Sequence, residues 1–309
     1  MKTVPKWKLI YSFSPRHKPA EYVKPREKVR LELEDAFGGQ VKNESMPLEE
    51  LDWTKVNGAT GPIFIEGAKR GDTLIVRVEE IKVADKGVIA VVPKQGALRD
   101  KPFKAGIKVV PISGEYAMFE KGVKVKIRPM IGTIGVAPEF DEIPTGSLGK
   151  HGGNMDVKDV TCGAILYLPV FVDGALFAAG DLHAIQADGE ACVSAVEVSG
   201  ELTLSFEVLK GKSVPWPVLE NEESYAILVC GDSLDEACSL AVDEAVKALM
   251  REHNWSFEEA YMFASLVVDL RINQVVDPKK GVRAVIPKEF VSLKGLCGKF
   301  QDCINFEAF

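Results

Sequence analysis

The sequence predicts an α+β fold that is predominantly β, with a β-sandwich or barrel-like body and a smaller C-terminal α/β unit. In the first two-thirds of the 309-residue chain, charged and apolar residues alternate in short runs, as in half-buried strands. Apolar residues at helical spacing gather only near the C-terminus. The rigid segment Pro215-Trp216-Pro217 lies between the two regions. We therefore expect a β-rich body at 1–215 that carries the candidate site motifs described below, and an α/β unit at 216–309 that completes the fold.

The strands of the body follow two patterns. Alternating runs predict strands at Lys28–Leu33, Thr73–Val83, Val123–Ile127 and Glu201–Val208. The apolar runs Ala164–Val172 and Ala175–Ala179 predict central strands, because their low polarity indicates burial on both faces. Asp173-Gly174 separates these two runs and predicts a hairpin, since Asp-Gly fits the tight turn that joins antiparallel strands.

The C-terminal unit combines strands with two helices. A strand at Tyr225–Gly231 precedes a helix that Asp232 or Ser233 can cap and that runs to about His253. Ser256 and Glu259 have capping-box spacing, which predicts a second helix from Phe257 to about Val267. The remaining expected strands lie near Asp269–Val276 and Val282–Ile286.

Composition narrows the class of protein. The formal net charge of −7 argues against nucleic acid or an anionic membrane as the main partner, because both are negatively charged. No apolar run approaches bilayer length, and the basic N-terminus lacks the apolar core of a secretory signal. We therefore expect a cytoplasmic protein with reduced thiols. The six cysteines are Cys162, Cys192, Cys230, Cys238, Cys297 and Cys303.

Two of the four histidines, His151 and His183, fall in one Gly-rich, acidic stretch at 151–190. Asp181 and His183 are two residues apart, so on a strand they point to the same face; Asp188 and Glu190 have the same relation. Imidazole together with carboxylate suits zinc and similar divalent ions. The same spacing is also compatible with a solvated strand end or a hydrogen-bonded pair, so spacing alone leaves the metal site open.

Cys162 offers a different chemistry. It precedes an apolar strand and lies near Lys150, His151 and Asp159 in sequence, so an activated thiolate could attack a carbonyl carbon through an acyl intermediate. A cysteine in this position is also a common small apolar residue, and the case for Cys192 is weaker.

Several stretches together resemble the acetamidase/formamidase family. The shared motifs occur in order from about residue 30 to beyond 280. They are Asp35-Ala36-Phe37-Gly38-Gly39-Gln40, Thr60–Gly67, Pro129–Pro138, Ile143-Pro144-Thr145-Gly146, His151–Asp156, Leu166–Val172 and Gly180–Glu190. The chain departs from the usual family pattern at Leu182 and Ala187, where relatives commonly have glycine. We expect both departures to change local backbone freedom more than chemistry, with a reshaped pocket as the alternative.

The resemblance implies hydrolysis of short linear amides to a carboxylate and ammonia, by an oligomer of two or more copies with a divalent metal. Zinc is the expected ion, with calcium or another divalent ion as alternatives. The implied metal ligands are Asp156, Asp181 and His183, with His151 and Asp35 as further ligands. Glu190 or Asp188 would act as the general base, and Asn154 and Gln186 would hold the amide or the developing oxyanion. A cysteine amidase using Cys162, and a non-catalytic module that binds a metal or ligand, remain the alternatives.

Overall fold

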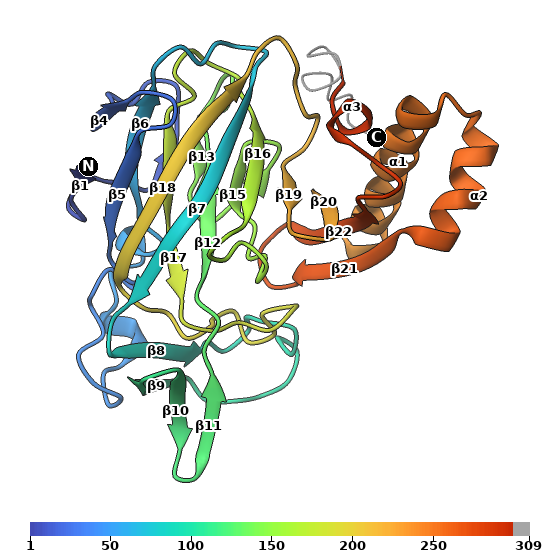
Figure 1. Cartoon of the computed structure of the whole chain (residues 1–309). Coiled ribbons are helices and arrows are strands. Elements are labelled where there is room, and N and C mark those ends of the chain that lie inside the picture. The colour runs from blue at the N-terminus through green and yellow to red at the C-terminus, as the bar shows by residue number, and fades with distance from the viewer. Residues whose placement is uncertain (299–309) are drawn as a thin grey trace.

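The computed structural model describes residues 1–298, and most of its regular structure is in strands (Figure 1). A nine-stranded sheet has the order β1 (Lys2–Val4), β5 (Lys28–Leu33), β18 (Gly200–Leu209), β7 (Thr73–Val83), β16 (Ile165–Pro169), β19 (Val218–Glu220), β20 (Ser224–Gly231), β22 (Lys280–Pro287) and β21 (Asp269–Gln274). The strands of the expected body and those of the expected C-terminal unit thus form one continuous sheet.

A seven-stranded sheet carries the Gly-rich stretch of the sequence. Its members are β14 (Leu148–Gly149), β15 (Gly152–Asn154), β12 (Met130–Gly135), β17 (Phe177–His183), β6 (Ala59–Ile65) and β2 (Leu9–Ile10), with β4 (Glu21–Val23) paired to β6. The two large sheets pack on each other through apolar side chains. Phe177 of β17 meets Phe206 of β18 edge to face, with ring centroids 5.0 Å apart, and both side chains are fully buried.

Smaller elements extend this sandwich. A four-stranded sheet has the order β11 (Val123–Lys126), β10 (Tyr116–Glu120), β9 (Gly106–Ser113) and β8 (Lys86–Val91), and its β10–β11 hairpin projects from the body (Figure 1). A two-stranded sheet joins β13 (Ile143–Pro144) to β3 (Ser12–Phe13). Two 3-10 turns occupy Leu48–Glu50 and Trp53–Lys55.

The helices lie near the C-terminal end of the described chain. They are α1 (Leu234–His253), α2 (Phe257–Val267) and the short α3 (Leu293–Leu296). Ser233 caps α1, and Ser256 forms a capping box with Glu259 at the start of α2, as the sequence predicts. Between residues 1 and 298, no helix is long and apolar enough to cross a membrane.

The predicted α+β, predominantly β fold is confirmed, but the predicted Asp173-Gly174 hairpin is wrong. β16 pairs with β7 and β19 in the nine-stranded sheet, whereas β17 pairs with β12 and β6 in the seven-stranded sheet. The segment between them turns through Gly174, Ala175 and Leu176, all with positive φ, and carries the chain from one sheet to the other. A turn dipeptide favours a reversal of direction but does not choose the partner of each strand.

Candidate active site

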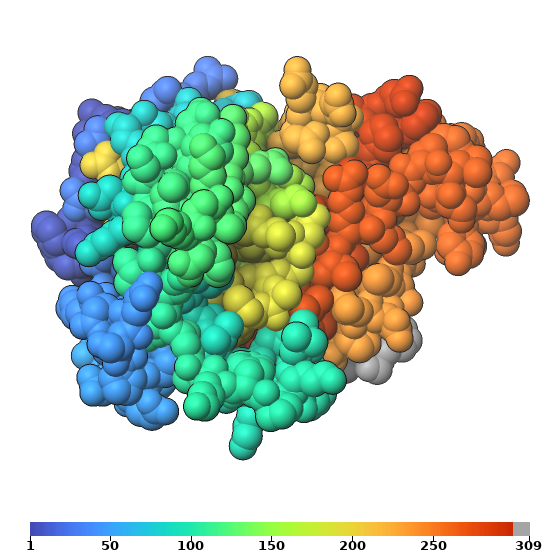
Figure 2. Space-filling view, turned by 90° about the horizontal axis from the view of Figure 1, so that it is seen from below, coloured from blue at the N-terminus to red at the C-terminus, as the bar shows by residue number. Residues whose placement is uncertain are grey.

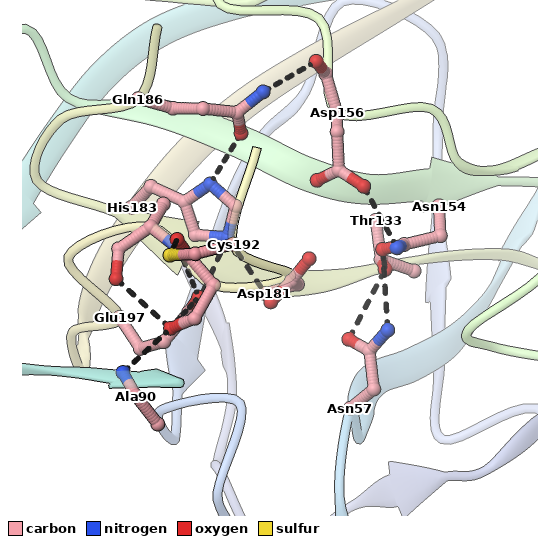
Figure 3. Close-up of polar contacts among 12 residues, drawn as sticks. Asn57, Ala90, Thr133, Asn154, Asp156, Asp181, His183, Gln186, Cys192 and Glu197 are labelled. Carbon is pink, nitrogen blue, oxygen red and sulfur yellow. Dashed lines mark hydrogen bonds and ion pairs between the residues drawn. The ribbon is translucent and has the colours of Figure 1, made fainter. Parts of the chain in front are cut away.

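Buried acidic side chains converge on one imidazole. Two groups of potential metal-binding residues share His183: Asp156, His183 and Glu190 form one, and Asp181, His183 and Glu197 form the other. In each group one ligand atom per residue lies within 4.8 Å of the others, and all five residues are buried. Figure 3 shows Asp181 and Glu197 next to the His183 ring.

Strand pairing brings these residues together. Asp181 and His183 lie at the end of β17, and His183 pairs with Glu197 through an isolated antiparallel bridge. Asp156 follows β15, which pairs with β12, the strand beside β17. Glu190 follows Gly189, which bridges to the edge strand β21. The site therefore depends on contacts between segments far apart in the sequence.

The backbone adopts an unusual conformation at three of the four acids. Asp156, Asp181 and Glu190 have φ angles of 48°, 55° and 44°. Non-glycine residues rarely occupy this left-handed region, and they concentrate at functional sites when they do. Gly132 of β12 provides room for two of the carboxylates: a Cβ there would lie 2.5 Å from Oδ1 of Asp156 and would also collide with Asp181.

Hydrogen bonds determine which nitrogen of His183 carries its proton. The Gln186 amide nitrogen donates to the Asp156 carbonyl at 2.8 Å, so the Gln186 oxygen faces His183 Nδ1, also at 2.8 Å. Since an amide oxygen only accepts, Nδ1 must be the donor. In the neutral ring, the lone pair on Nε2 therefore points toward the carboxylates of Glu197 at 2.9 Å and Asp181 at 3.2 Å.

This arrangement fits a bound cation. Asp156 Oδ1 is buried without a hydrogen-bond partner within residues 1–298, and in the neutral His183 ring Nε2 has no proton to donate to Glu197 Oε2, 2.9 Å away. Ligand atoms that share a tetrahedral zinc ion lie roughly 3.3 Å apart, which is close to the separations around Nε2. A neutral imidazole that donates its other N–H to a protein oxygen is the usual form of a metal-binding histidine. The donor set thus suits a divalent metal.

The charge balance supports the same conclusion. Burial and the neighbouring Asp181 raise the pKa of Asp156 well above its usual value, and burial and Asp156 do the same to the pKa of Glu190. Burial also raises the pKa of Glu197. Burial would lower the pKa of His183, but Glu197 and Asp181 raise it well above its usual value. Four carboxylates around one imidazole leave an excess of negative charge that a divalent cation would neutralise.

Asn154 anchors one side of the cluster. Its amide nitrogen donates to Asp156 Oδ2 at 2.8 Å and to Asp277 Oδ2 at 3.0 Å. Its oxygen accepts from Thr133 Oγ1 at 2.6 Å and from Asn57 Nδ2 at 3.1 Å (Figure 3). Both amide hydrogens of Asn154 are therefore used within the protein. Burial raises the pKa of Asp277 to about 7, although the Asn154 hydrogen bond acts in the opposite direction.

His151 and Asp277 line a cavity of about 590 Å³ beside the cluster. The wall is largely apolar and includes Phe140, Leu148 and Phe171. His151 is buried, and its Nε2 has no hydrogen-bond partner in the part of the chain that the structure describes. Burial lowers the pKa of His151 to about 4, so the ring is neutral at physiological pH. His151 belongs to neither of the two ligand groups.

Three other candidates lie outside the ligand groups. Asp188 forms ion pairs with Lys158 at 2.8 Å and with the fully buried Arg283 at 2.9 Å. Asp35 accepts a hydrogen bond from the Gly39 amide at 3.0 Å and lines a small cavity of about 90 Å³ that Glu197 also lines. Cys162 is exposed, and its thiol donates to the Glu79 carbonyl at 3.2 Å. Cys303 lies outside the described residues.

The structure adds two residues that sequence reasoning missed. Glu197 is a member of a ligand group, and Asp277 meets Asn154 from beyond β21. Neither residue lies in a sequence motif whose spacing relates it to the other residues of the cluster. The positive-φ conformations of the neighbouring acids also leave no signal in the sequence.

Known proteins of one family are similar to this chain in sequence and in structure. The profile of the Acetamidase/Formamidase family matches residues 9–145 and 142–292. The structure of a predicted acetamidase/formamidase from Thermoanaerobacter tengcongensis is 40% identical, with a TM-score of 0.92 over 96% of this chain and 98% of that one. An acetamidase from Bacillus halodurans is 36% identical, with a TM-score of 0.91 over 93% and 98%. A putative formamidase of Schizosaccharomyces pombe is 26% identical, and the alignment covers 62% of each chain. The chain belongs to the acetamidase/formamidase family.

Proposed function

We propose that this protein hydrolyses short linear amides, such as formamide and acetamide, to a carboxylate and ammonia with the help of a divalent metal. The observation that carries the proposal is the His183 imidazole, whose Nε2 lies 2.9 Å from Glu197 and 3.2 Å from Asp181, both of which are buried carboxylates. The names of the related proteins, formamidase and acetamidase, support the choice of an amide as substrate.

Asp181, His183 and Glu197 are the proposed ligands, with Asp156 beside them as a further ligand. Zinc is the proposed ion because an imidazole ligand suits zinc, whereas calcium prefers oxygen ligands alone. When bound, such an ion polarises the amide carbonyl and makes water more acidic. Gln186 holds the His183 ring in the tautomer that leaves Nε2 free.

Glu190 is the proposed general base. It is buried beside Asp156 and His183, and its raised pKa brings it closer to the range in which a carboxylate accepts a proton effectively. Its carboxylate takes a proton from water as the water oxygen bonds to the amide carbon. It then returns the proton to the nitrogen as the carbon–nitrogen bond breaks, which releases ammonia and the carboxylate. Asp188 is a weaker candidate, because Lys158 and Arg283 hold it in ion pairs.

Asn154 positions the cluster rather than the substrate in this proposal, since both of its amide hydrogens are already used by Asp156 and Asp277. The cavity beside His151 and Asp277 is the proposed route by which the amide reaches the cluster. Asp35 would act at most through Glu197, across the small cavity that both residues line.

The test separates metal binding from proton transfer. Ammonia release is measured with formamide, acetamide and propionamide, and zinc content is measured by mass spectrometry. We expect Glu197→Gln to lose both zinc and activity. Glu190→Gln should keep zinc but lose about 100-fold or more in kcat, the usual range for a general base. The exposed Glu222→Gln serves as the matched control. Full activity in chelated, zinc-free protein would overturn the metal proposal.

Two alternatives have their own outcomes in the same assay. Loss of activity in Cys162→Ala, with zinc content unchanged, would support the cysteine nucleophile. Absence of ammonia release from every amide, with stoichiometric metal, would support a non-catalytic binding module.

The partners, the cellular location and the oligomeric state are proposed on other grounds. The net charge of −7 supports a protein that binds neither nucleic acid nor an anionic membrane. We propose a cytoplasmic homo-oligomer, with the part of the chain after residue 215 as its second structural unit.

A further inference from the structure

Helix α2 buries unusually little of its apolar surface. Its inward face contributes only Ala260 and Ala264 to the buried residues. On its outer side, Tyr261, Met262 and Leu266 are 50%, 66% and 78% exposed. A helix that is apolar on most of its surface is normally covered by protein. Figures 1 and 2 show the C-terminal helices at one end of the molecule, beyond the β body.

The edge strand β21 continues this apolar surface. Leu270 and Ile272 are 42% and 39% exposed, and Leu270 lines one groove of about 380 Å³ together with Phe257 and Tyr261 of α2. We define the α2–β21 surface by its six exposed apolar residues: Phe257, Tyr261, Met262, Leu266, Leu270 and Ile272.

The outer edge of β21 is available for pairing. β21 is the last strand of the nine-stranded sheet, and β22 is its neighbour on the inner side. Within residues 1–298, the bridge recorded on its outer side joins Gln274 to Gly189, so the four residues from Asp269 to Ile272 have no outer strand partner. An edge strand with unpaired backbone groups and without proline or lysine is a template for another strand, and the irregular register of β21 begins only after Ile272.

The charges on β21 match a second copy of the same strand. Asp269 and Arg271 flank Leu270, and their side chains are 70% and 47% exposed. If two copies pair antiparallel with Leu270 opposite Leu270, Asp269 of each copy lies opposite Arg271 of the other. Opposite charges in directly facing positions stabilise an antiparallel pair, and like charges destabilise it.

We propose that the α2–β21 surface is a two-fold interface between two copies of this chain, with the β21 strands paired antiparallel across the axis. Aromatic side chains carry about 150–250 Å² each, and with values near the lower end of that range for the four aliphatic ones, the six at these exposures present roughly 600 Å² of surface. A stable interface buries about 800 Å² per partner, and the backbone edge with its polar neighbours supplies the remainder. The pairing joins the two nine-stranded sheets and lets the two α2 helices cover each other.

The experiment measures molar mass by light scattering during size-exclusion chromatography at micromolar concentrations, with circular dichroism to verify folding. The wild-type protein should have twice the 33.7 kDa mass of one chain. Leu266→Glu should reduce it to 33.7 kDa. The matched control Val125→Glu, on the exposed β10–β11 hairpin, should remain a dimer. The readout does not depend on amide hydrolysis, so it stands apart from the test of the proposed function.

Charge exchange tests the pairing register without disturbing the apolar surface. Asp269→Arg alone places two like-charge pairs across the axis and should weaken dimerisation about tenfold. Arg271→Asp alone should do the same, and the combination of both changes should restore the wild-type affinity. A monomeric wild-type protein, a dimer that survives Leu266→Glu, or a failure of the combined exchange to restore affinity would overturn the proposal.

Discussion

Removal of the proposed metal should lower the melting temperature of this protein by about 4 °C. Without a cation, the carboxylates of Asp156, Asp181, Glu190 and Glu197 remain buried around a single imidazole. A ligand present at 100 times its dissociation constant stabilises the folded state by about 2.7 kcal/mol. Unfolding entropy of about 2.1 cal/mol/K per residue gives roughly 0.65 kcal/mol/K for 309 residues, and the ratio is about 4 °C.

Differential scanning calorimetry of zinc-loaded and chelated protein measures this shift. Glu197→Gln should abolish the difference, because it removes a proposed ligand, whereas the exposed Glu222→Gln should retain it. The shift should also grow with zinc concentration, as mass action requires. Superimposable melting curves for loaded and chelated wild-type protein would refute the inference that the buried carboxylates around His183 bind a cation.

Three further predictions address neighbouring residues. Cys162→Ala should leave kcat/KM for acetamide unchanged, because the thiol is exposed and outside the ligand groups; a large loss would contradict this. Gly132→Ala should reduce the zinc content measured by mass spectrometry, since its Cβ would collide with Asp156 and Asp181; a full complement of zinc would argue against this crowding. Asp188→Asn should lower the free energy of unfolding in urea by about 1–2 kcal/mol, because Arg283 loses an ionic partner. An unchanged urea midpoint would count against that ion pair.

Local patterns predicted much of the fold because they reflect local physics. The structure has strands at Lys28–Leu33 and Thr73–Val83 and a helix at Phe257–Val267, with the predicted bounds. In each case the periodicity of apolar residues or a capping box defines the element. The hairpin at Asp173-Gly174 was wrong because the runs on both sides are apolar throughout. Such strands carry no alternating pattern that would specify a partner or a register.

The site likewise combines contacts that a local pattern predicts with contacts that depend on how the sheets pack. Asp181 and His183 are two residues apart on one strand, so their spacing alone indicated that their side chains could meet. The structure places Asp181 Oδ1 3.2 Å from His183 Nε2. Glu197 reaches His183 through an isolated bridge, and Asp277 reaches Asn154 from a loop 123 residues away. Contacts of this kind depend on the packing of whole sheets. No local pattern in a single sequence encodes them.

The cluster should reduce the stability of the metal-free protein. Asp156, Asp181 and Glu190 adopt left-handed backbone conformations, which cost on the order of 1 kcal/mol each, and their carboxylates are buried beside one another. Replacing one acid by its neutral isostere removes part of the repulsion while the shape is kept. In chelated protein at pH 8, Glu190→Gln should therefore raise the melting temperature by about 2–5 °C, equivalent to about 1–3 kcal/mol.

In zinc-loaded protein the same substitution should give little or no gain, because the cation already neutralises the cluster. The comparison of Glu190→Gln with wild type, each chelated and loaded, thus measures how much of the repulsion the metal relieves. A variant that is less stable than wild type after chelation would show that Glu190 stabilises the fold by contacts other than those with the cluster. Stabilisation only in the chelated state would link the arrangement of these acids directly to cation binding.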